Sequence, residues 1–274
     1  MEQKTVLITG ITGAIGKAAA IEFAKNNCRL ILSGRDTDRV SAVKSEIEAL
    51  TGNHDLDIAI ADLSEPQSIR LAVQVIKKKY NSLNGLLNIA GIFKSRRLEN
   101  SAGLEYMFAT NHLGPFVLTN ELLDLLKSGK GRIVTVAAPS TTKINFNDLQ
   151  GKNKFSAGFL GSFGASKMMN IMFTYALARR LNGSGVTANV FHPGLVRSGL
   201  TDDMPAIMNF LFKVISGKPD KPAGMLYRLV NGKEFENVNG KFYQFDGKEI
   251  SSSKYSYDTD IQEKLWSISE KLSE

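Results

Sequence analysis

A glycine-rich segment near the start of the chain is the strongest candidate for binding chemistry. It runs from Thr9 to Gly16 and follows a short apolar run. Glycine allows a tight turn and lets backbone N–H groups approach a pyrophosphate, and the dipole of a helix that begins there favours negative charge. A purely structural turn also needs glycine, but the place of this one between a strand-like and a helix-like run predicts dinucleotide binding. The residues expected to contact the cofactor here are Gly10, Thr12, Gly13, Ile15 and Gly16.

The residues about 20 positions further on predict which dinucleotide binds. An acidic residue at the end of the second strand binds the ribose 2′-hydroxyl of NAD, whereas an arginine there accommodates the 2′-phosphate of NADP. Gly34 stands where the acid is expected, and Arg35 follows it. Asp36 offers a competing carboxylate, which we interpret as the N-cap of the next helix. The sequence therefore favours NADP(H) over NAD(H).

These residues can act together only if the fold places them at one edge of a sheet. Strand-like and helix-like segments alternate along the chain, and runs such as Val6–Ile8 and Leu30–Leu32 are continuously apolar, which is typical of parallel strands buried on both faces. Strands are expected at 5–9, 29–33, 56–61, 83–90, 131–137, 186–191 and 241–245, and helices at 14–25, 36–50, from about 64, 104–126, 163–181 and 258–272. This pattern predicts an α/β fold, a single Rossmann-type doubly wound parallel sheet of about seven strands flanked by helices. Residues 1–274 form one domain in this view, with substrate-side loops at about 141–161 and 198–220.

Composition excludes several classes of protein. The chain is 43% hydrophobic and 22% charged, as in ordinary soluble globular proteins. Its one cysteine, Cys28, allows no intrachain disulfide, which suits a reducing, cytoplasmic setting. No charged and apolar leader precedes the first strand, and no run of about 18 apolar residues occurs, so we expect no integral membrane segment.

The basic balance of the chain has a simple explanation. The formal charge is +7 and the pI is about 9.3. Lysines and arginines are spread along the chain rather than interleaved with aromatic residues, so we expect no nucleic-acid partner. A phosphate-rich cofactor accounts for part of the excess. The three histidines do not sit at metal-ligand spacing, and no metal is expected.

Further motifs occur in the order and spacing of a known family. They are Thr9–Gly16 with Ala14 in place of a glycine, Asp62-Leu63, Asn88 to Gly91, Asn111, His192 to Ser198, and Gly240 to Tyr243 followed by Trp266. On these motifs the chain resembles the short-chain dehydrogenases/reductases over nearly its whole length, and in particular their retinol-dehydrogenase-like group. The resemblance implies further cofactor contacts from Asp62, Leu63, Asn88, Ala90, Gly91, Lys167, Pro193, Gly194, Val196 and Ser198.

The catalytic positions depart from the family pattern. Family members use a serine, a tyrosine and a lysine, helped by an asparagine. The resemblance makes Asn111 that asparagine and Lys167 that lysine, which holds the nicotinamide ribose and lowers the pKa of the tyrosine. The tyrosine position, four residues before Lys167, holds Phe163. The serine position, 25 residues before Phe163, holds Ala138.

Both missing groups are hydroxyls with defined chemical roles. A phenyl ring neither donates nor accepts a proton, and losing a positioned general acid costs about 10²–10⁴-fold in rate. A methyl group cannot hydrogen-bond a carbonyl, and losing such a donor costs about 10²–10³-fold. Ser140, Thr141, Ser162 and Ser166 lie nearby in sequence, with Ser140 the best placed of them, but we do not expect a serine to replace an activated phenol. Little or no ordinary carbonyl reduction is predicted for the chain as written.

Two explanations for the missing hydroxyls stay open. In one, the chain is an engineered, inactivated version of an active oxidoreductase, since the two changes are the minimal hydroxyl deletions. In the other, a natural protein has lost its redox centre and uses the NADP(H)-bound pocket for other chemistry, such as isomerisation or cyclisation, or as a cofactor sensor. A third hypothesis is an interaction module with an empty cleft.

The substrate and the assembly are expected from two apolar patterns. The stretch 207–215, with Phe210, Leu211 and Phe212, predicts a lid over an apolar small-molecule substrate, and a membrane-dipping segment is the alternative. Met168, Met169, Met172 and Phe173 are interpreted as core or subunit contact. By resemblance to family members whose long helices pair between subunits, we expect a homodimer or homotetramer.

Overall fold

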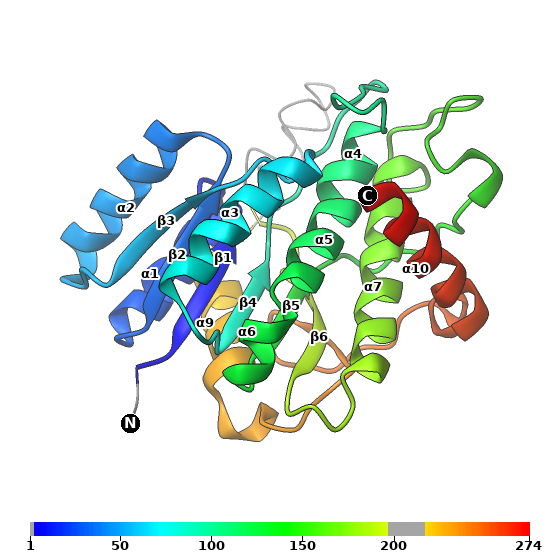
Figure 1. The fold of residues 1–274 in the computed structure, drawn as a ribbon. Coiled ribbons are helices and arrows are strands. Elements are labelled where there is room, and N and C mark those ends of the chain that lie inside the picture. Colours follow the sequence, from blue (N-terminus) through cyan, green and yellow to red (C-terminus); the bar gives the residue numbers. More distant parts are fainter. Residues whose placement is uncertain (1–2, 197–216) are drawn as a thin grey trace.

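A seven-stranded parallel sheet forms the centre of the molecule (Figure 1). The computed structural model describes residues 3–196 and 217–274. The strand order is β3-β2-β1-β4-β5-β6-β7, and every pair of neighbours is parallel. The strands are β1 Thr5–Thr9, β2 Arg29–Gly34, β3 Leu56–Ile60, β4 Gly85–Asn88, β5 Arg132–Val136, β6 Thr187–His192 and β7 Phe242–Gln244. The predicted fold class is confirmed, with strand bounds close to the expected ones.

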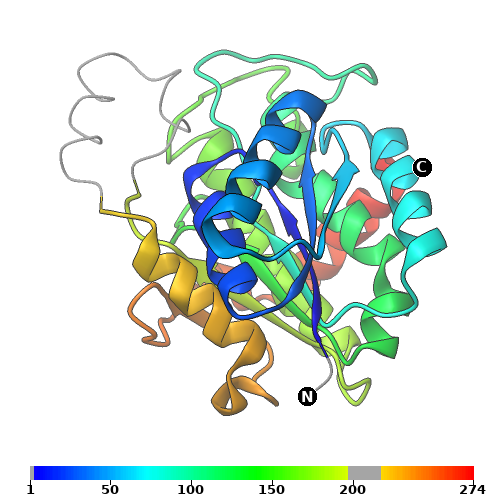
Figure 2. The same ribbon diagram turned by 90° about the vertical axis from the view of Figure 1, so that its left-hand side faces the viewer.

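Helices cover both faces of the sheet because each strand buries residues on both of its sides. On one face, Leu7 and its counterparts in other strands pack beneath α3 Pro66–Lys79, α5 Gly114–Glu121 and α7 Ser162–Arg180. On the other face, Val6 and Ile8 pack against α1 Ala14–Lys25 and α9 Asp220–Asn231. Figure 2 shows α9 lying beside α1 on that face. The remaining helices are α2 Thr37–Thr51, α4 Tyr106–Phe108, α6 Leu123–Ser128 and α10 Thr259–Ser273.

The strand order reverses between β1 and β4, and open α/β sheets form their ligand crevice at the carboxyl ends of such a strand pair. From β1 the chain builds outward through β2 to β3, and it then returns to β4 on the opposite side of β1. Loops leave in opposite directions at such a switch point, and ligands of open α/β sheets bind in the space between them. The glycine-rich turn follows β1, so it lies at this crevice.

The helix expected over 104–126 is present, from Tyr106 to Ser128, but it is not one regular α-helix. A π-helix, Ala109–Leu113, joins α4 to α5, and α6 follows after Leu122. Pro115 has no N–H to donate to the carbonyl four residues back, at Asn111, and this frees the preceding turn to widen. Gly114 also passes so close to Leu63 that a Cβ would lie 2.3 Å from the Leu63 carbonyl oxygen. Wide turns of this kind are frequent at functional sites.

Helix α9 was not expected from the sequence. Its buried residues Met225, Leu226, Leu229 and Val230 recur at helical spacing, and Pro222 stands near its start. Both signals are present in the sequence, directly after the loop predicted at 198–220. The predicted loop and lid at 198–220 lie mostly outside the described residues, as does the apolar stretch 207–215.

The closing helix α10 is confirmed, and it packs over α5 and α7. The Trp266 ring lies 4.9 Å from that of Phe116 and 5.8 Å from that of Phe173. The methionine pattern of α7 belongs to the core of the chain itself, with Met168 and Met172 fully buried. Of the helices in the described part of the chain, none is long and apolar enough to cross a membrane.

Candidate cofactor cleft and active site

The turn after β1 is built so that only glycine fits at its key positions. Gly10 has φ +71°, and a Cβ on it would lie 2.8 Å from Cα of Ala90. A Cβ on Gly16 would lie 2.2 Å from the Gly10 carbonyl oxygen, closer than real Cβ atoms come. These glycines bring the first turn of α1 against the end of β1. Thr12 and Ile15, expected to contact the cofactor, are half-buried in the same turn.

A threonine hydroxyl fastens this turn to β4. Thr9 Oγ1 donates to the Leu87 carbonyl oxygen at 3.2 Å, and it accepts from the backbone N–H groups of Ile89 and Ala90 at 3.0 and 3.2 Å. The strands on the two sides of the crevice are thereby locked in register at their carboxyl ends. Asn88 is buried and donates to Thr119 Oγ1 at 3.0 Å, so its side chain points into α5.

The first turn of α1 fits a pyrophosphate. Its N-cap is Gly13, which offers no side-chain oxygen to the N–H groups behind it, and the first turn holds no acidic residue. Free N–H groups at a helix start attract anions. Gly13 itself is exposed and lets an incoming group approach the backbone. The chain thus presents the features of a dinucleotide-binding turn.

The end of β2 presents a guanidinium toward the same crevice. Asp36 caps α2 by accepting from the backbone N–H of Arg39 at 3.0 Å, as predicted, so its carboxylate is engaged. Arg35 is exposed, and its Nη1 donates to Tyr106 Oη at 2.8 Å. Gly34 packs against Val40, where a Cβ would lie 2.7 Å from a methyl carbon. The Arg35 guanidinium is therefore the charged group at this position that is available to a ligand.

Asn111 and Lys167 meet at Gly91. The Asn111 side chain is fully buried in the π-helix, where it accepts from the Ile92 N–H at 2.7 Å and donates to the Ile92 carbonyl at 3.0 Å and to Ser166 Oγ at 3.1 Å. A Cβ on Gly91 would lie 3.3 Å from Lys167 Nζ and 3.5 Å from Asn111 Oδ1. The predicted pair is thus brought together, with room beside it that any side chain at position 91 would fill.

Lys167 is a buried cation. Its side chain is 7% exposed, and burial lowers its pKa to about 8. Within the described residues it has no hydrogen-bond partner, and its Nζ lies 5.3 Å from the centroid of the Phe163 ring. An ammonium without an acceptor is costly inside a protein, so the position favours a ligand that supplies oxygen atoms.

Phe163 sits in an aromatic cluster where the family pattern has a phenol. It is 2% exposed, and its ring packs edge-on against Phe93 at 5.7 Å and Phe159 at 5.2 Å. Met107 completes the buried part of this cluster. Ala138, two residues beyond β5, is half-buried. In the described part of the chain, the Phe163 ring is thus packed among apolar side chains and beside the Lys167 ammonium.

The neighbouring serines are engaged elsewhere. Ser140 Oγ donates to the Gly164 carbonyl at 2.9 Å and accepts from the Thr142 N–H at 3.2 Å. Ser166 Oγ donates to the Phe163 carbonyl at 2.7 Å while accepting from Asn111. Both hydroxyls serve the backbone of the loop after β5 and the first turns of α7. Neither is free to act on a substrate without breaking these bonds.

The remaining predicted cofactor residues lie around the crevice at the ends of β3 and β6. Asp62 accepts from Ser64 at 2.9 and 2.7 Å, and Leu63 is buried beside α5. Gly194, with φ +73°, follows Pro193 after β6, and a Cβ on it would lie 2.8 Å from the Phe245 ring. Val196 forms a bridge with Gly217. Ser198 lies outside the described residues.

Sequence reasoning missed the roles of Thr9, Phe93 and Tyr106. The role of the Thr9 hydroxyl could not be predicted because its hydrogen-bond partners are backbone groups about 80 residues away in the chain. The other two are joined to Phe163 and Arg35 only by the fold.

Substituting Lys167 should reveal its burial as a pH-dependent stability difference. The pKa of this lysine is lower folded than unfolded, so the unfavourable burial of its charge is fully present below pH 8 and is relieved as pH rises from 8 to 10.5. We expect Lys167→Met to be more stable than the parent by about 3 kcal/mol at pH 7, with the difference shrinking above pH 8. Urea unfolding of both proteins from pH 6 to 10 measures it. Lys79→Met, at an exposed lysine, is the control, and a pH-independent difference at position 167 would contradict the prediction.

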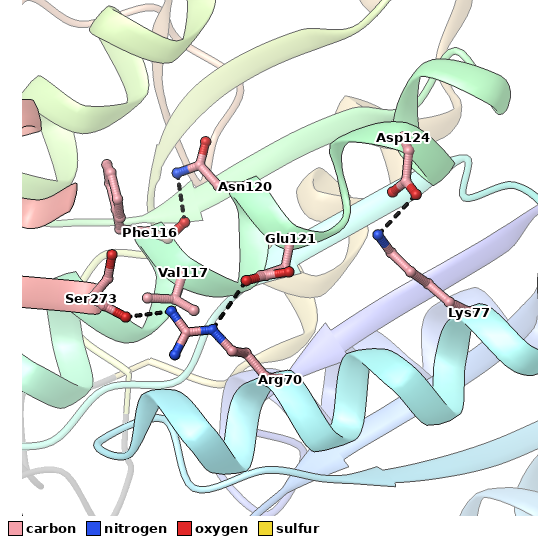
Figure 3. A pocket seen from close by; sticks show the side chains of 8 residues that line it. All are labelled: Arg70, Lys77, Phe116, Val117, Asn120, Glu121, Asp124 and Ser273. Carbon is pink, nitrogen blue, oxygen red and sulfur yellow. Dashed lines mark hydrogen bonds and ion pairs between the residues drawn. The ribbon is translucent and has the colours of Figure 1, made fainter. Parts of the chain in front are cut away.

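A hollow of about 500 Å³ lies away from the crevice, between α3, α5 and the end of α10 (Figure 3). Its charges are paired: Arg70 contacts Glu121 at 3.2 Å and the Ser273 carbonyl, and Lys77 contacts Asp124 at 2.8 Å. It offers no unpaired group for catalysis. Among the described residues, no three His, Cys, Asp or Glu side chains gather as a metal site.

Comparison with known proteins places this geometry in a family. Residues 4–207 match the model of the family described as short chain dehydrogenase. The chain is 34% identical to human retinol dehydrogenase 14, over 98% of this chain and 86% of that protein.

Solved structures share the fold. One is an uncharacterised protein from Mycobacterium paratuberculosis, with 25% identity and a TM-score of 0.77 over 99% of this chain and 93% of that one. Another is a short-chain dehydrogenase from Burkholderia cenocepacia in complex with NADP, with 27% identity and a TM-score of 0.70 over 89% of this chain and 96% of that one. The chain therefore belongs to the short-chain dehydrogenase/reductase family of oxidoreductases, which uses NAD(P)(H), and is related to the retinol dehydrogenases.

Proposed function

We propose that this protein binds NADP(H) and an apolar carbonyl or alcohol, and that its hydride-transfer chemistry is disabled at Phe163 and Ala138. The observation that carries the proposal is the environment of the Phe163 ring, which is buried between two phenylalanine rings and beside the Lys167 ammonium. The position beside the cation, where proton transfer would be needed, holds a phenyl ring.

The residues of the crevice divide the binding of the dinucleotide among them. The turn from Gly10 to Gly16 would hold the pyrophosphate, Arg35 the 2′-phosphate, and Lys167 the nicotinamide ribose. When bound, the cofactor supplies or accepts a hydride. Proton transfer to or from the substrate oxygen is the task of the protein, and neither Phe163 nor Ala138 can perform it.

The apolar substrate is supported by the relatives and by the mouth of the cleft. Retinol, which names those relatives, is an apolar alcohol. Phe159, which contacts Phe163, is 44% exposed, and the adjacent Leu160 is 84% exposed. Large apolar side chains left open beside the site favour an apolar ligand.

A non-redox reaction is the second candidate, and Lys167 favours it. Its pKa of about 8 lets it exchange a proton near neutral pH, and it has no hydrogen-bond partner among the described residues. Isomerisation or cyclisation of a bound substrate would then proceed with the cofactor as a fixed part of the pocket. A product isomeric with its substrate would identify this case.

The proposal is tested by titrating the purified chain with NADPH and NADH in a calorimeter. We expect NADPH to bind in the micromolar range or tighter, and more tightly than NADH, because only NADPH carries the phosphate that Arg35 can pair with. Absence of binding by both cofactors at about 1 mM would exclude the proposal and leave an interaction module with an empty cleft. Equal affinities would contradict the role of Arg35.

A further inference from the structure

Tyr106 reaches Arg35 from the opposite side of the crevice. Arg35 directly follows β2, which lies on one side of β1, whereas Tyr106 begins α4, which packs against α7 on the other side. The 2.8 Å hydrogen bond between Arg35 Nη1 and Tyr106 Oη joins positions 71 residues apart in the chain. The two side chains together bridge the site proposed above for the dinucleotide.

The tyrosine is presented from a braced turn. Its backbone N–H donates to the Leu98 carbonyl at 2.9 Å. The preceding residue, Glu105, is 2% exposed, and its carboxylate accepts from the N–H groups of Met107 and Phe108 at 3.0 and 2.6 Å. Gln150 Oε1 also accepts from the Glu105 N–H at 2.6 Å. The backbone that carries Tyr106 is therefore held by local structure, and its half-buried side chain has fewer rotatable bonds than the long and exposed side chain of Arg35.

A fixed acceptor changes what an exposed arginine can do. A guanidinium has five N–H donors, and Tyr106 uses one of them on one edge. The other edge stays available for a bidentate contact with a phosphate. Because the free side chain has many rotamers, orienting it before the ligand arrives lowers the entropic cost of binding.

We propose that Tyr106 is a cofactor-specificity residue that orients the Arg35 guanidinium toward the 2′-phosphate of NADP(H). The inference rests on the proposed binding of NADP(H) and adds a residue to it. Tyr106 acts through Arg35, so it is a positioning residue, and its effect is confined to the cofactor that carries the 2′-phosphate.

The test compares Tyr106→Phe with the parent by calorimetric titration of NADPH and of NADH. Loss of the hydroxyl should weaken NADPH binding about three- to tenfold, and it should change NADH binding less than twofold. Tyr257→Phe is the matched control, since Tyr257 is 49% exposed and stacks on Tyr175 away from the crevice. It should leave both affinities unchanged.

A double-mutant cycle with Arg35→Ala separates positioning from a general structural effect. Once Arg35 is removed, Tyr106→Phe should have no further effect on NADPH binding, because the two residues act as one unit. Equal weakening of NADPH and NADH by Tyr106→Phe would overturn the inference, and so would tighter NADPH binding, which would mean that Tyr106 competes with the phosphate. A parent that binds neither cofactor would instead refute the proposed function.

Discussion

The double variant Ala138→Ser/Phe163→Tyr should reduce hydrophobic aldehydes or ketones with NADPH at least about 10³-fold faster than the parent chain. The new phenol would stand where the Phe163 ring lies 5.3 Å from Lys167 Nζ, and a neighbouring ammonium stabilises the phenolate. The serine would add a hydroxyl two residues beyond β5, at a half-buried position. Following NADPH absorbance with a panel of apolar carbonyl compounds measures kcat/KM.

The controls test whether the rate increase comes from restoring the catalytic site or merely from adding a hydroxyl group near it. Each single variant should recover only part of the rate, because a proton donor and an oxyanion donor serve the same transition state. Phe159→Tyr is the matched control, because its ring contacts Phe163 but is 44% exposed, whereas Phe163 is 2% exposed. Failure of the double variant to turn over any substrate, with NADPH binding intact, would favour the non-redox candidate.

Gly10→Val should abolish measurable NADPH binding, with at least a 100-fold loss of affinity. A side chain at this position, already at φ +71°, would meet both Cα and N of Ala90, at 2.8 and 2.9 Å. The backbone that follows β4 cannot yield without breaking the hydrogen bonds that the Ile89 and Ala90 N–H groups make to Thr9 Oγ1. The turn must therefore move away from the position that suits a pyrophosphate. Calorimetry and thermal unfolding measure the two consequences.

Gly52→Ala is the control for Gly10→Val, because it places a side chain at a positive φ without a steric clash. Gly52 caps α2 with φ +69°, and nothing lies within 4 Å of the Cβ that it would gain. This variant should lose about 1 kcal/mol of stability and keep its affinity for NADPH. If Gly10→Val bound NADPH as well as Gly52→Ala does, the turn would not be the pyrophosphate site.

The elements and motifs with local signals could be predicted from the sequence. Continuous apolar runs predicted the strands, and Asp36 was identified as an N-cap because capping depends on residues three positions apart. The break in the helix after residue 108 was missed even though Pro115 marks it, because the apolar spacing continues across the wide turn. The spacing of apolar residues does not show that the hydrogen bond lost at Pro115 changes the preceding turn from an α-helix to a π-helix.

The candidate site divides in the same way. Gly10 to Gly16, Arg35 and Lys167 stand in motifs with fixed spacing, and the structure brings Lys167 and Asn111 to the same glycine. Tyr106 belongs to no recognisable motif, and its role could not be predicted because it depends on a hydrogen bond with Arg35, 71 residues away in the chain. Contacts between distant segments depend on the path that each loop takes over the edge of the sheet. That path cannot be predicted from the types of the individual residues.

The pairing of α1 with α9 has a consequence for how the chain acquires its structure during synthesis. Helix α1 leaves the ribosome well before α9, yet Phe23 of α1 and Tyr227 of α9 pack edge-on at 5.2 Å. Val6, Ile8 and Phe23 therefore lack their apolar cover until some 200 further residues have been translated. Folding dominated by such distant contacts is slow, and exposed apolar strands invite aggregation in the interval. The nascent chain should accordingly depend on chaperones, and release from the ribosome before α9 has emerged should leave it insoluble.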